Sequence, residues 1–360
     1  DLPDGELDGR TALQAASTTH LDRLARHGRI SNLGWDRPDG WSEPDVWAAL
    51  AGAPVPVALA RGPLEASALE VPLEARDLAF SAPILTGTVE RVAGTVGWFA
   101  PQELNSIVES LRPLWSRRWR WMAEPGAAVL RWTDGVGRRL SCTSPSDMIG
   151  QSLVNRLPEG DSAEELARLI WDSAEILDNH PVNRRRLGEG WDPLLALWPW
   201  GGGAALVLPE QVPGGWSAIA TEPAFLGLAR ALGMRCRPLD ASADLETALR
   251  ARVDAVQDRL HRGDRVVWTH VVRRGGAMDT NLAEIEAIDR DWVGELLRWS
   301  ENQTERLLWR VVWNGPKGTV VLDSDPLADP TGRLPFDGRG FDESRAVVSS
   351  AGLWRRHTER

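Results

Sequence analysis

The 360-residue sequence predicts an α/β protein, and the main reason is that helical and strand patterns alternate along the chain. Segments with apolar residues three or four positions apart alternate with short apolar runs, of which residues 265–272 are the clearest buried strand. A chain of this length exceeds the usual size of one hydrophobic core. We therefore expect one large domain or two of medium size.

The expected helices have the boundary residues that helices favour. A helix over 162–178 is strongly amphipathic, with Asp161 or Ser162 as its expected cap. Another begins at Pro101, because proline is favoured in the first helical turn, and continues to residue 111. The same spacing predicts helices over 19–27, 222–232, 245–261 and 281–300. Strands are expected over 94–98, 127–132, 204–208, 217–220, 265–272, 307–313 and 318–322.

Composition and charge exclude several classes of protein. The net charge of −10 argues against nucleic acid as a partner, which would require clustered positive charge. The basic run over 117–121 is a local exception, either a solvated strand with one packed face, which we favour, or an anion or partner site. Cys142 and Cys236 form no Cys-x-x-Cys pair, so a disulfide scaffold or structural zinc is not expected. No apolar run suggests a membrane span or signal peptide, which predicts a cytoplasmic protein without a membrane partner.

The most specific stretch extends from His180 to Gly203 and reads His-Pro-Val-Asn-Arg-Arg-Arg, then Ala-Leu-Trp-Pro-Trp-Gly-Gly-Gly at its end. It resembles the cofactor-independent phosphoglycerate mutases of the archaeal type, in which a similar His-Pro-Val/Ile-Asn-x-x-Arg run leads to an Ala-Ile/Leu-Trp-x-Trp-Gly turn. The resemblance covers nearly the whole chain, because further segments follow the order of that family, at residues 7–16, 20–28, 61–66, 77–80, 157–161 and 268–271.

The resemblance implies an alkaline-phosphatase-like core sheet flanked by helices, with an inserted α+β cap domain. Residues 1–55 would form the first part of the core, residues 56–190 the cap, and residues 191–360 the second part of the core. The proline-rich residues 53–56 and the Gly-Glu-Gly at 188–190 are the expected hinges.

The chemistry of that family requires two divalent metal ions, manganese or zinc, and a Ser or Thr nucleophile that carries the phosphoryl group. Ser42 is the only candidate nucleophile, within a segment that is one residue longer than the pattern of the family. The alternative, which we favour, is that Ser42 caps a helix. Asp1 matches only the end of the family's first ligand segment.

The later ligand segments depart further from the pattern. Arg273 and Arg274 stand where the resemblance implies acidic ligands, and Asp279 is the only carboxylate nearby. The Pro-Asp-His pair is replaced by a turn at Trp313, and Leu322 replaces the histidine of the final segment. Other residues do not rebuild the site in our interpretation. His270 is either a site residue or, as we favour, a histidine at the end of a strand. Asp323 and Asp325 form either a cation contact or, as we favour, a solvated turn.

Three hypotheses follow from these departures. The first is an active, metal-dependent mutase that interconverts 2- and 3-phosphoglycerate. The second is a catalytically impaired homologue without the metal ions that binds a small phosphorylated acid, and the third is an interaction or scaffold protein. We favour the second or third, with no cofactor expected. The basic and amide side chains that would contact the acid are Arg61, Asn183, Arg184, Arg273 and Arg274.

Overall fold

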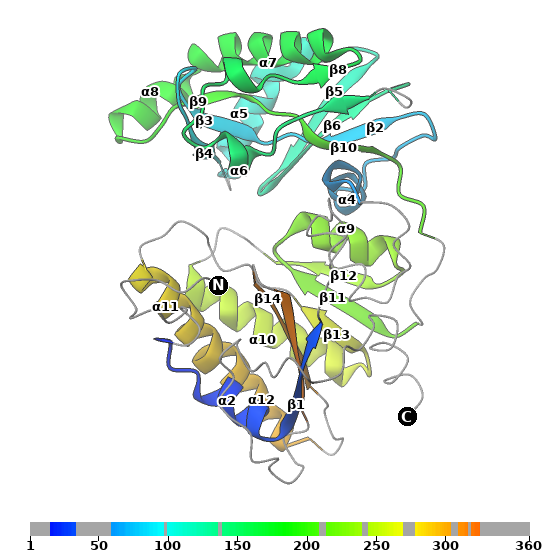
Figure 1. The fold of residues 1–360 in the computed structure, drawn as a ribbon, viewed down its shortest axis with the longest axis vertical. Coiled ribbons are helices and arrows are strands. Elements are labelled where there is room, and N and C mark those ends of the chain that lie inside the picture. Colours follow the sequence, from blue (N-terminus) through cyan, green and yellow to red (C-terminus); the bar gives the residue numbers. More distant parts are fainter. Residues whose placement is uncertain are drawn as a thin grey trace.

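The computed structural model describes residues 15–33, 59–96, 99–135, 139–208, 214–239, 244–268, 278–303, 309–315 and 318–324. It is a mixed α/β structure with two lobes (Figure 1). We call them the upper lobe, which holds the described residues within 59–208, and the lower lobe, which holds those within 15–33 and 214–324. The prediction of an α/β protein is confirmed. Within the described residues, no helix is long and apolar enough to cross a membrane.

The upper lobe is built on a four-stranded antiparallel sheet with the strand order β10-β2-β6-β5. Two amphipathic helices cover one face of this sheet, because their apolar residues form a single core with Trp121, Leu130 and Trp132 of the strands. The strands are β2 (Leu78–Ser81), β5 (Trp119–Glu124), β6 (Ala127–Trp132) and β10 (Trp200–Ala204), and the helices are α5 (Pro101–Leu111) and α7 (Ala163–Asp178).

Smaller elements complete the upper lobe. A second antiparallel sheet has the order β4-β3-β9, and a two-stranded ribbon pairs β7 with β8. The bounds are β3 (Ile84–Gly87), β4 (Val92–Thr95), β7 (Leu140–Ser141), β8 (Glu159–Gly160), β9 (Leu194–Leu197), η2 (Arg112–Leu114), α6 (Pro145–Met148), η3 (Val154–Arg156) and α8 (Pro181–Gly188).

The lower lobe contains two three-stranded sheets. One is parallel with the order β12-β11-β13, and the other is antiparallel with the order β1-β15-β14. Helices cover both faces of the parallel sheet, since Ala218 and Ala220 pack in the cluster of α9 while Ile219 packs in that of α10. The strands are β1 (Gly28–Leu33), β11 (Trp216–Ala220), β12 (Arg235–Pro238), β13 (Arg265–Trp268), β14 (Trp309–Gly315) and β15 (Gly318–Ser324).

The helices of the lower lobe are joined by an interaction between distant parts of the chain. Asp289 lies in the π-helical turn η4, and its carboxylate accepts hydrogen bonds from the backbone N–H groups of His20 and Leu21, at 3.0 and 2.7 Å. It therefore caps the first turn of α2, whose own N-cap side chain forms no such bond. The helices are α2 (Thr19–Arg26), α9 (Pro223–Ala231), α10 (Leu245–His261), α11 (Met278–Ala287), η4 (Ile288–Val293) and α12 (Gly294–Glu301).

Helix α4 (Arg61–Ala68) lies at the junction of the lobes, beneath the upper sheet and against α9 in Figure 1. Two glycines permit this close packing. A Cβ atom added to Gly227 of α9 would lie 1.7 Å from the carbonyl oxygen of Leu64, and one added to Gly62 would lie 2.2 Å from that of Ala79. Helix α4 is therefore in backbone contact with both a strand above it and a helix below it.

Several predicted boundaries agree with the structure and others differ, such as the strand expected at 94–98, which the structure has at Val92–Thr95. The helices expected at 101–111 and 245–261 and the strand at 127–132 are confirmed residue for residue. The strand expected at 204–208 is wrong, because β10 ends at Ala204. Ser162 is the N-cap residue of α7, as expected, but it has a φ of 62° and its side chain forms no capping bond. Its carbonyl oxygen instead accepts from Glu165 and Leu166.

Candidate functional site

The candidate site is a charge cluster at the junction of the lobes, centred on Arg61 at the first residue of α4. Arg61 Nε donates to Glu65 Oε1 at 2.7 Å, one helical turn further on, and Arg61 Nη2 donates to Glu222 Oε1. The Arg61 Cζ atom also lies 5.5 Å from the ring centroid of Trp200, within the range of a cation–π interaction. The cluster thus joins α4, the residue before α9, and β10.

The glycine run of β10 explains how these elements come so close. Gly201 has a φ of +57°, in the left-handed region that favours glycine, and a Cβ atom there would lie 3.0 Å from the Cβ of Arg61. A Cβ atom at Gly202 would lie 2.2 Å from the ring of Phe80. The Trp-Gly-Gly-Gly sequence therefore lets α4 lie directly against the strand.

The electrostatics of the cluster oppose the capture of an anion by Arg61. Its guanidinium already binds two carboxylates, and all three side chains are at most one quarter exposed. Burial is the main cause that raises the pKa of Glu65, and the positive charge of Arg61 acts in the opposite direction. A phosphate that approached Arg61 would have to replace one of these carboxylates, because like charges repel at short distance.

Asn183 is buried in the upper lobe, and its side chain is bonded to the backbone. Its Oδ1 accepts from the Leu194 N–H at 2.7 Å, while its Nδ2 donates to the carbonyl oxygens of Leu177 and Leu194 at 2.8 and 2.9 Å. These bonds tie the first turn of α8 to α7 and β9. Nearby, His180 Nδ1 accepts from the Val182 N–H and caps α8. In the structure, the segment that carries the family resemblance therefore serves architecture.

The other predicted site residues are divided between exposed positions and segments that are not described. Arg184 is exposed on α8. Ser42, Arg273 and Arg274 lie outside the described residues, as do His270 and Asp325. Of the predicted contact residues, the structure thus describes three, Arg61, Asn183 and Arg184. They belong to different environments, a charge cluster between the lobes, a buried backbone tie and a solvated helix face.

The positions linked to metal binding are described only in part. Leu322 on β15 is fully buried, within an apolar cluster that includes Leu24 of α2 and Ile219 of β11. For Asp279 and Trp313 only the backbone is described, in α11 and β14. Among the described residues, no three His, Cys, Asp or Glu side chains lie close enough together to hold a metal ion. Leu322 itself has no lone pair to offer to a metal ion.

Sequence reasoning did not find the carboxylate partners of Arg61. Glu65 had a readable signal, since residues four apart on a helix are neighbours. Glu222 had none, because it lies 161 residues away along the chain.

A second polar cluster was also not predicted. Buried Asp264, the residue before β13, accepts from Ser217 Oγ of β11 at 2.6 Å and from Arg235 of β12 at 2.5 Å, so it joins the N-terminal ends of the three parallel strands.

Comparisons with known proteins agree on one family. Residues 54–183 match the family model described as 2,3-bisphosphoglycerate-independent phosphoglycerate mutase. A Geobacter sulfurreducens protein named "Probable 2,3-bisphosphoglycerate-independent phosphoglycerate mutase" is 30% identical over 325 residues, which cover 84% of this chain and 79% of that protein. The 2,3-bisphosphoglycerate-independent phosphoglycerate mutase of Methanosarcina barkeri is 28% identical over an alignment of 380 residues, gaps included, which covers 98% of this chain and 94% of that protein.

Two solved structures share the fold. The protein PH0037 from Pyrococcus horikoshii superimposes with a TM-score of 0.64 at 20% identity, covering 93% of this chain and 88% of that one. The cofactor-independent phosphoglycerate mutase from Thermoplasma acidophilum superimposes with a TM-score of 0.55 at 20% identity, covering 100% and 96%. Sequence similarity along most of the length, together with this shared fold, shows that the chain belongs to the 2,3-bisphosphoglycerate-independent phosphoglycerate mutase family.

Proposed function

We propose that this chain is a catalytically impaired member of its family, in which the two-metal centre is not assembled. Leu322 carries the proposal. The resemblance implies a histidine ligand at this position, and the side chain found there is fully buried among hydrocarbon groups. A divalent ion in such surroundings would be costly, since a charge needs ligands or water to offset its loss of solvation.

The sequence of the segment after β13 supports the same proposal. Arg273 and Arg274 stand where the resemblance implies acidic ligands. An arginine carries a fixed positive charge and cannot donate a lone pair to a metal ion. Two arginines would therefore repel the divalent ions that the family uses. The competing hypothesis, an active mutase, is favoured by family membership itself.

We further propose an alkaline-phosphatase-like core with an inserted cap. In the division that the sequence predicts, residues 1–55 and 191–360 form the core and residues 56–190 the cap. Strand pairing favours one change, since β9 pairs with β3 and β10 pairs with β2. On that basis the second boundary would follow residue 204 and not residue 190.

Binding of a small phosphorylated acid at Arg61 would require the cluster to release one of its two carboxylates. The acid's phosphate would replace Glu222 at Arg61 Nη2, while Glu65 would stay on Nε. Glu222 is the partner more easily displaced, because its side chain is 21% exposed and that of Glu65 is 5% exposed. Arg184, Arg273 and Arg274 remain the other proposed contacts, and Asn183 would contribute only if it gave up its backbone bonds.

Titration calorimetry with 3-phosphoglycerate tests this binding. Glu222→Gln removes the competing negative charge, so we expect it to bind the acid roughly tenfold more tightly than the original chain, about 1.4 kcal/mol. Glu164→Gln, an exposed change on α7, is the matched control and should leave the affinity unchanged. An absence of heat and of thermal stabilisation with millimolar 3-phosphoglycerate, in both the original chain and Glu222→Gln, would rule out binding at Arg61.

Catalytic impairment is tested separately with an enolase-coupled assay supplied with manganese. The Methanosarcina barkeri relative serves as the positive control. We expect no interconversion above background from this chain. Interconversion that disappears in Ser42→Ala would contradict the proposal, and it would establish Ser42 as the nucleophile in place of a helix cap.

A further inference from the structure

Strand β5 (Trp119–Glu124) forms one edge of the four-stranded sheet of the upper lobe. In an antiparallel pair, alternate residues exchange backbone hydrogen bonds with the neighbouring strand. The Thr133 N–H donates to the Arg118 carbonyl at 2.8 Å, so even-numbered residues bond to β6 and odd-numbered residues direct their backbone groups outward. The outward groups of Trp119 are bonded to Ser116. The outward-facing backbone groups of this edge are therefore those of Trp121 and Ala123.

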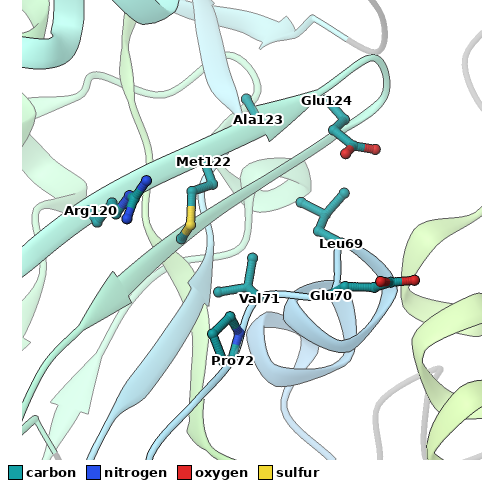
Figure 2. A pocket seen from close by; sticks show the side chains of 8 residues that line it. All are labelled: Leu69, Glu70, Val71, Pro72, Arg120, Met122, Ala123 and Glu124. Atoms are coloured by element: carbon teal, nitrogen blue, oxygen red, sulfur yellow. The ribbon is translucent and has the colours of Figure 1, made fainter.

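The side chains beside this edge form a groove of about 290 Å³ between β5 and the segment after α4 (Figure 2). Met122 lies between Arg120 and Glu124 on the strand, and all three point to the same side of the sheet because side chains alternate along a strand. Among the described residues, neither Arg120 nor Glu124 takes part in an ion pair. The opposite wall is formed by Leu69, Glu70, Val71 and Pro72.

The order of these three side chains makes the edge complementary to itself. If two copies pair antiparallel through this edge, the outward backbone groups of odd-numbered residues in one copy must bond to those of odd-numbered residues in the other. The possible registers therefore differ from one another by two residues. With Met122 on the two-fold axis, Trp121 pairs with Ala123 of the other copy, and Arg120 lies opposite Glu124. The neighbouring registers are less favourable. One sets Met122 opposite Glu124 and forms no ion pair, and the other sets Met122 opposite Arg120 and Glu124 opposite Arg118, which already pairs with Glu165.

We propose that β5 is a dimerisation edge, where a second copy of this chain continues the upper sheet across a two-fold axis through Met122. The two Trp121–Ala123 pairs form four backbone hydrogen bonds, and the two Arg120–Glu124 ion pairs select the register. The same patch serves both copies, as a two-fold interface requires. The ladder ends by itself, because Trp119 is bonded to Ser116 and Pro125 has no N–H to donate.

Charge reversal tests the proposed ion pairs. Sedimentation equilibrium of the full chain, between about 1 and 200 µM, measures its self-association. Arg120→Glu sets two carboxylates opposite one another, and Glu124→Arg sets two guanidiniums opposite one another. We expect each to weaken dimerisation by at least tenfold, and the double variant to restore it, since the swapped charges again attract. Arg156→Glu, an exposed change of equal charge in η3, should leave the dimer intact.

Cross-linking tests the register. In the proposed pairing the two Cα atoms of residue 122 are directly opposite, about 4.5 Å apart, which is within the span of a disulfide. The two copies of residue 124 are separated by about four residues along the strands, or roughly 13 Å, which is too far. Mild oxidation should therefore link Met122→Cys into a covalent dimer but leave Glu124→Cys unlinked.

Two results would overturn the proposed dimer. A chain that stays monomeric at 200 µM and does not cross-link through Met122→Cys would overturn it. A dimer that is unaffected by both charge reversals would also overturn it, because a different surface would then hold the copies together. Thermal unfolding of each variant confirms that the fold is kept, and cross-linking of Glu124→Cys in place of Met122→Cys would refute the register.

Discussion

Gly227 allows α9 to cross α4 in direct backbone contact, and Gly227→Ala should break this contact. The added Cβ would lie 1.7 Å from the Leu64 carbonyl oxygen, about half of an ordinary contact distance of 3.4 Å. Helix α4 has no room to retreat, since Gly62 on its other side already meets the backbone of Ala79. The two helices must therefore move apart and open the core of Leu64, Ala224 and Leu228.

The size of the effect follows from two opposing contributions. Overpacking of a rigid core costs about 3 kcal/mol in such a case, and the better helix propensity of alanine returns about 1 kcal/mol. We expect a net loss of about 2 kcal/mol, which corresponds to a fall in Tm of roughly 4–8 °C for a cooperative unit of 150–250 residues. Differential scanning calorimetry measures this fall directly.

Gly188→Ala is the matched control for this change. Gly188 is the last residue of α8, and an added Cβ there would meet nothing within 4 Å. The same substitution should therefore be neutral or raise the stability by up to about 1 kcal/mol. Equal Tm values for Gly227→Ala and Gly188→Ala would refute the reasoning, because they would mean that α4 and α9 do not meet through their backbones.

Three further predictions concern buried polar and thiol groups. Asn183→Ala should cost about 2–4 kcal/mol in chemical denaturation, because three side-chain hydrogen bonds to the backbone of Leu177 and Leu194 are lost, whereas exposed Asn179→Ala should cost little, and equal losses would contradict this. The Ser217 hydroxyl, followed by neighbouring arginines, lowers the pKa of Asp264. The ionised Asp264 carboxylate therefore stabilises the folded protein at pH values above its unfolded-state pKa, and this stabilisation is lost as the pH falls through its lower folded-state pKa. The destabilisation caused by Asp264→Asn at pH 7 should shrink toward zero near pH 2, and a loss independent of pH would argue against this linkage. Burial raises the pKa of Cys142 to about 11, so its reaction with a thiol reagent at pH 8 should be roughly a hundredfold slower than that of a free thiol, and a normal rate would disprove its burial.

Local rules account for most of the elements that were predicted correctly. The helix over 101–111 combines a proline at its start with apolar residues on one face, and both signals depend only on near neighbours. The strand expected over 204–208 is wrong, because an apolar run alone does not specify which of its residues pair with a neighbouring strand. The chain forms its strand earlier, through the glycines before Ala204, where the absence of side chains lets it pack against Phe80 and Arg61. That requirement is set by tertiary contacts.

The candidate site was predictable only in outline. Arg61 is part of a motif that the sequence shows, but its charge partner Glu222 lies 161 residues away and has no local signal. Asn183 was recognised from the same kind of resemblance, and its bonds to the backbone of Leu177 and Leu194 depend on how α7, α8 and β9 meet. A motif identifies which residues recur in a family. The partners of those residues come from the packing of the whole chain.

The central claim is that family membership and fold persist here without the two-metal chemistry. The most direct measurement is the rate of interconversion of 2- and 3-phosphoglycerate by the full chain with manganese, beside the Methanosarcina barkeri relative at equal concentration. The account predicts a rate no higher than that of the Ser42→Ala variant and of buffer alone. A rate comparable with that of the relative, abolished by Ser42→Ala, would contradict it.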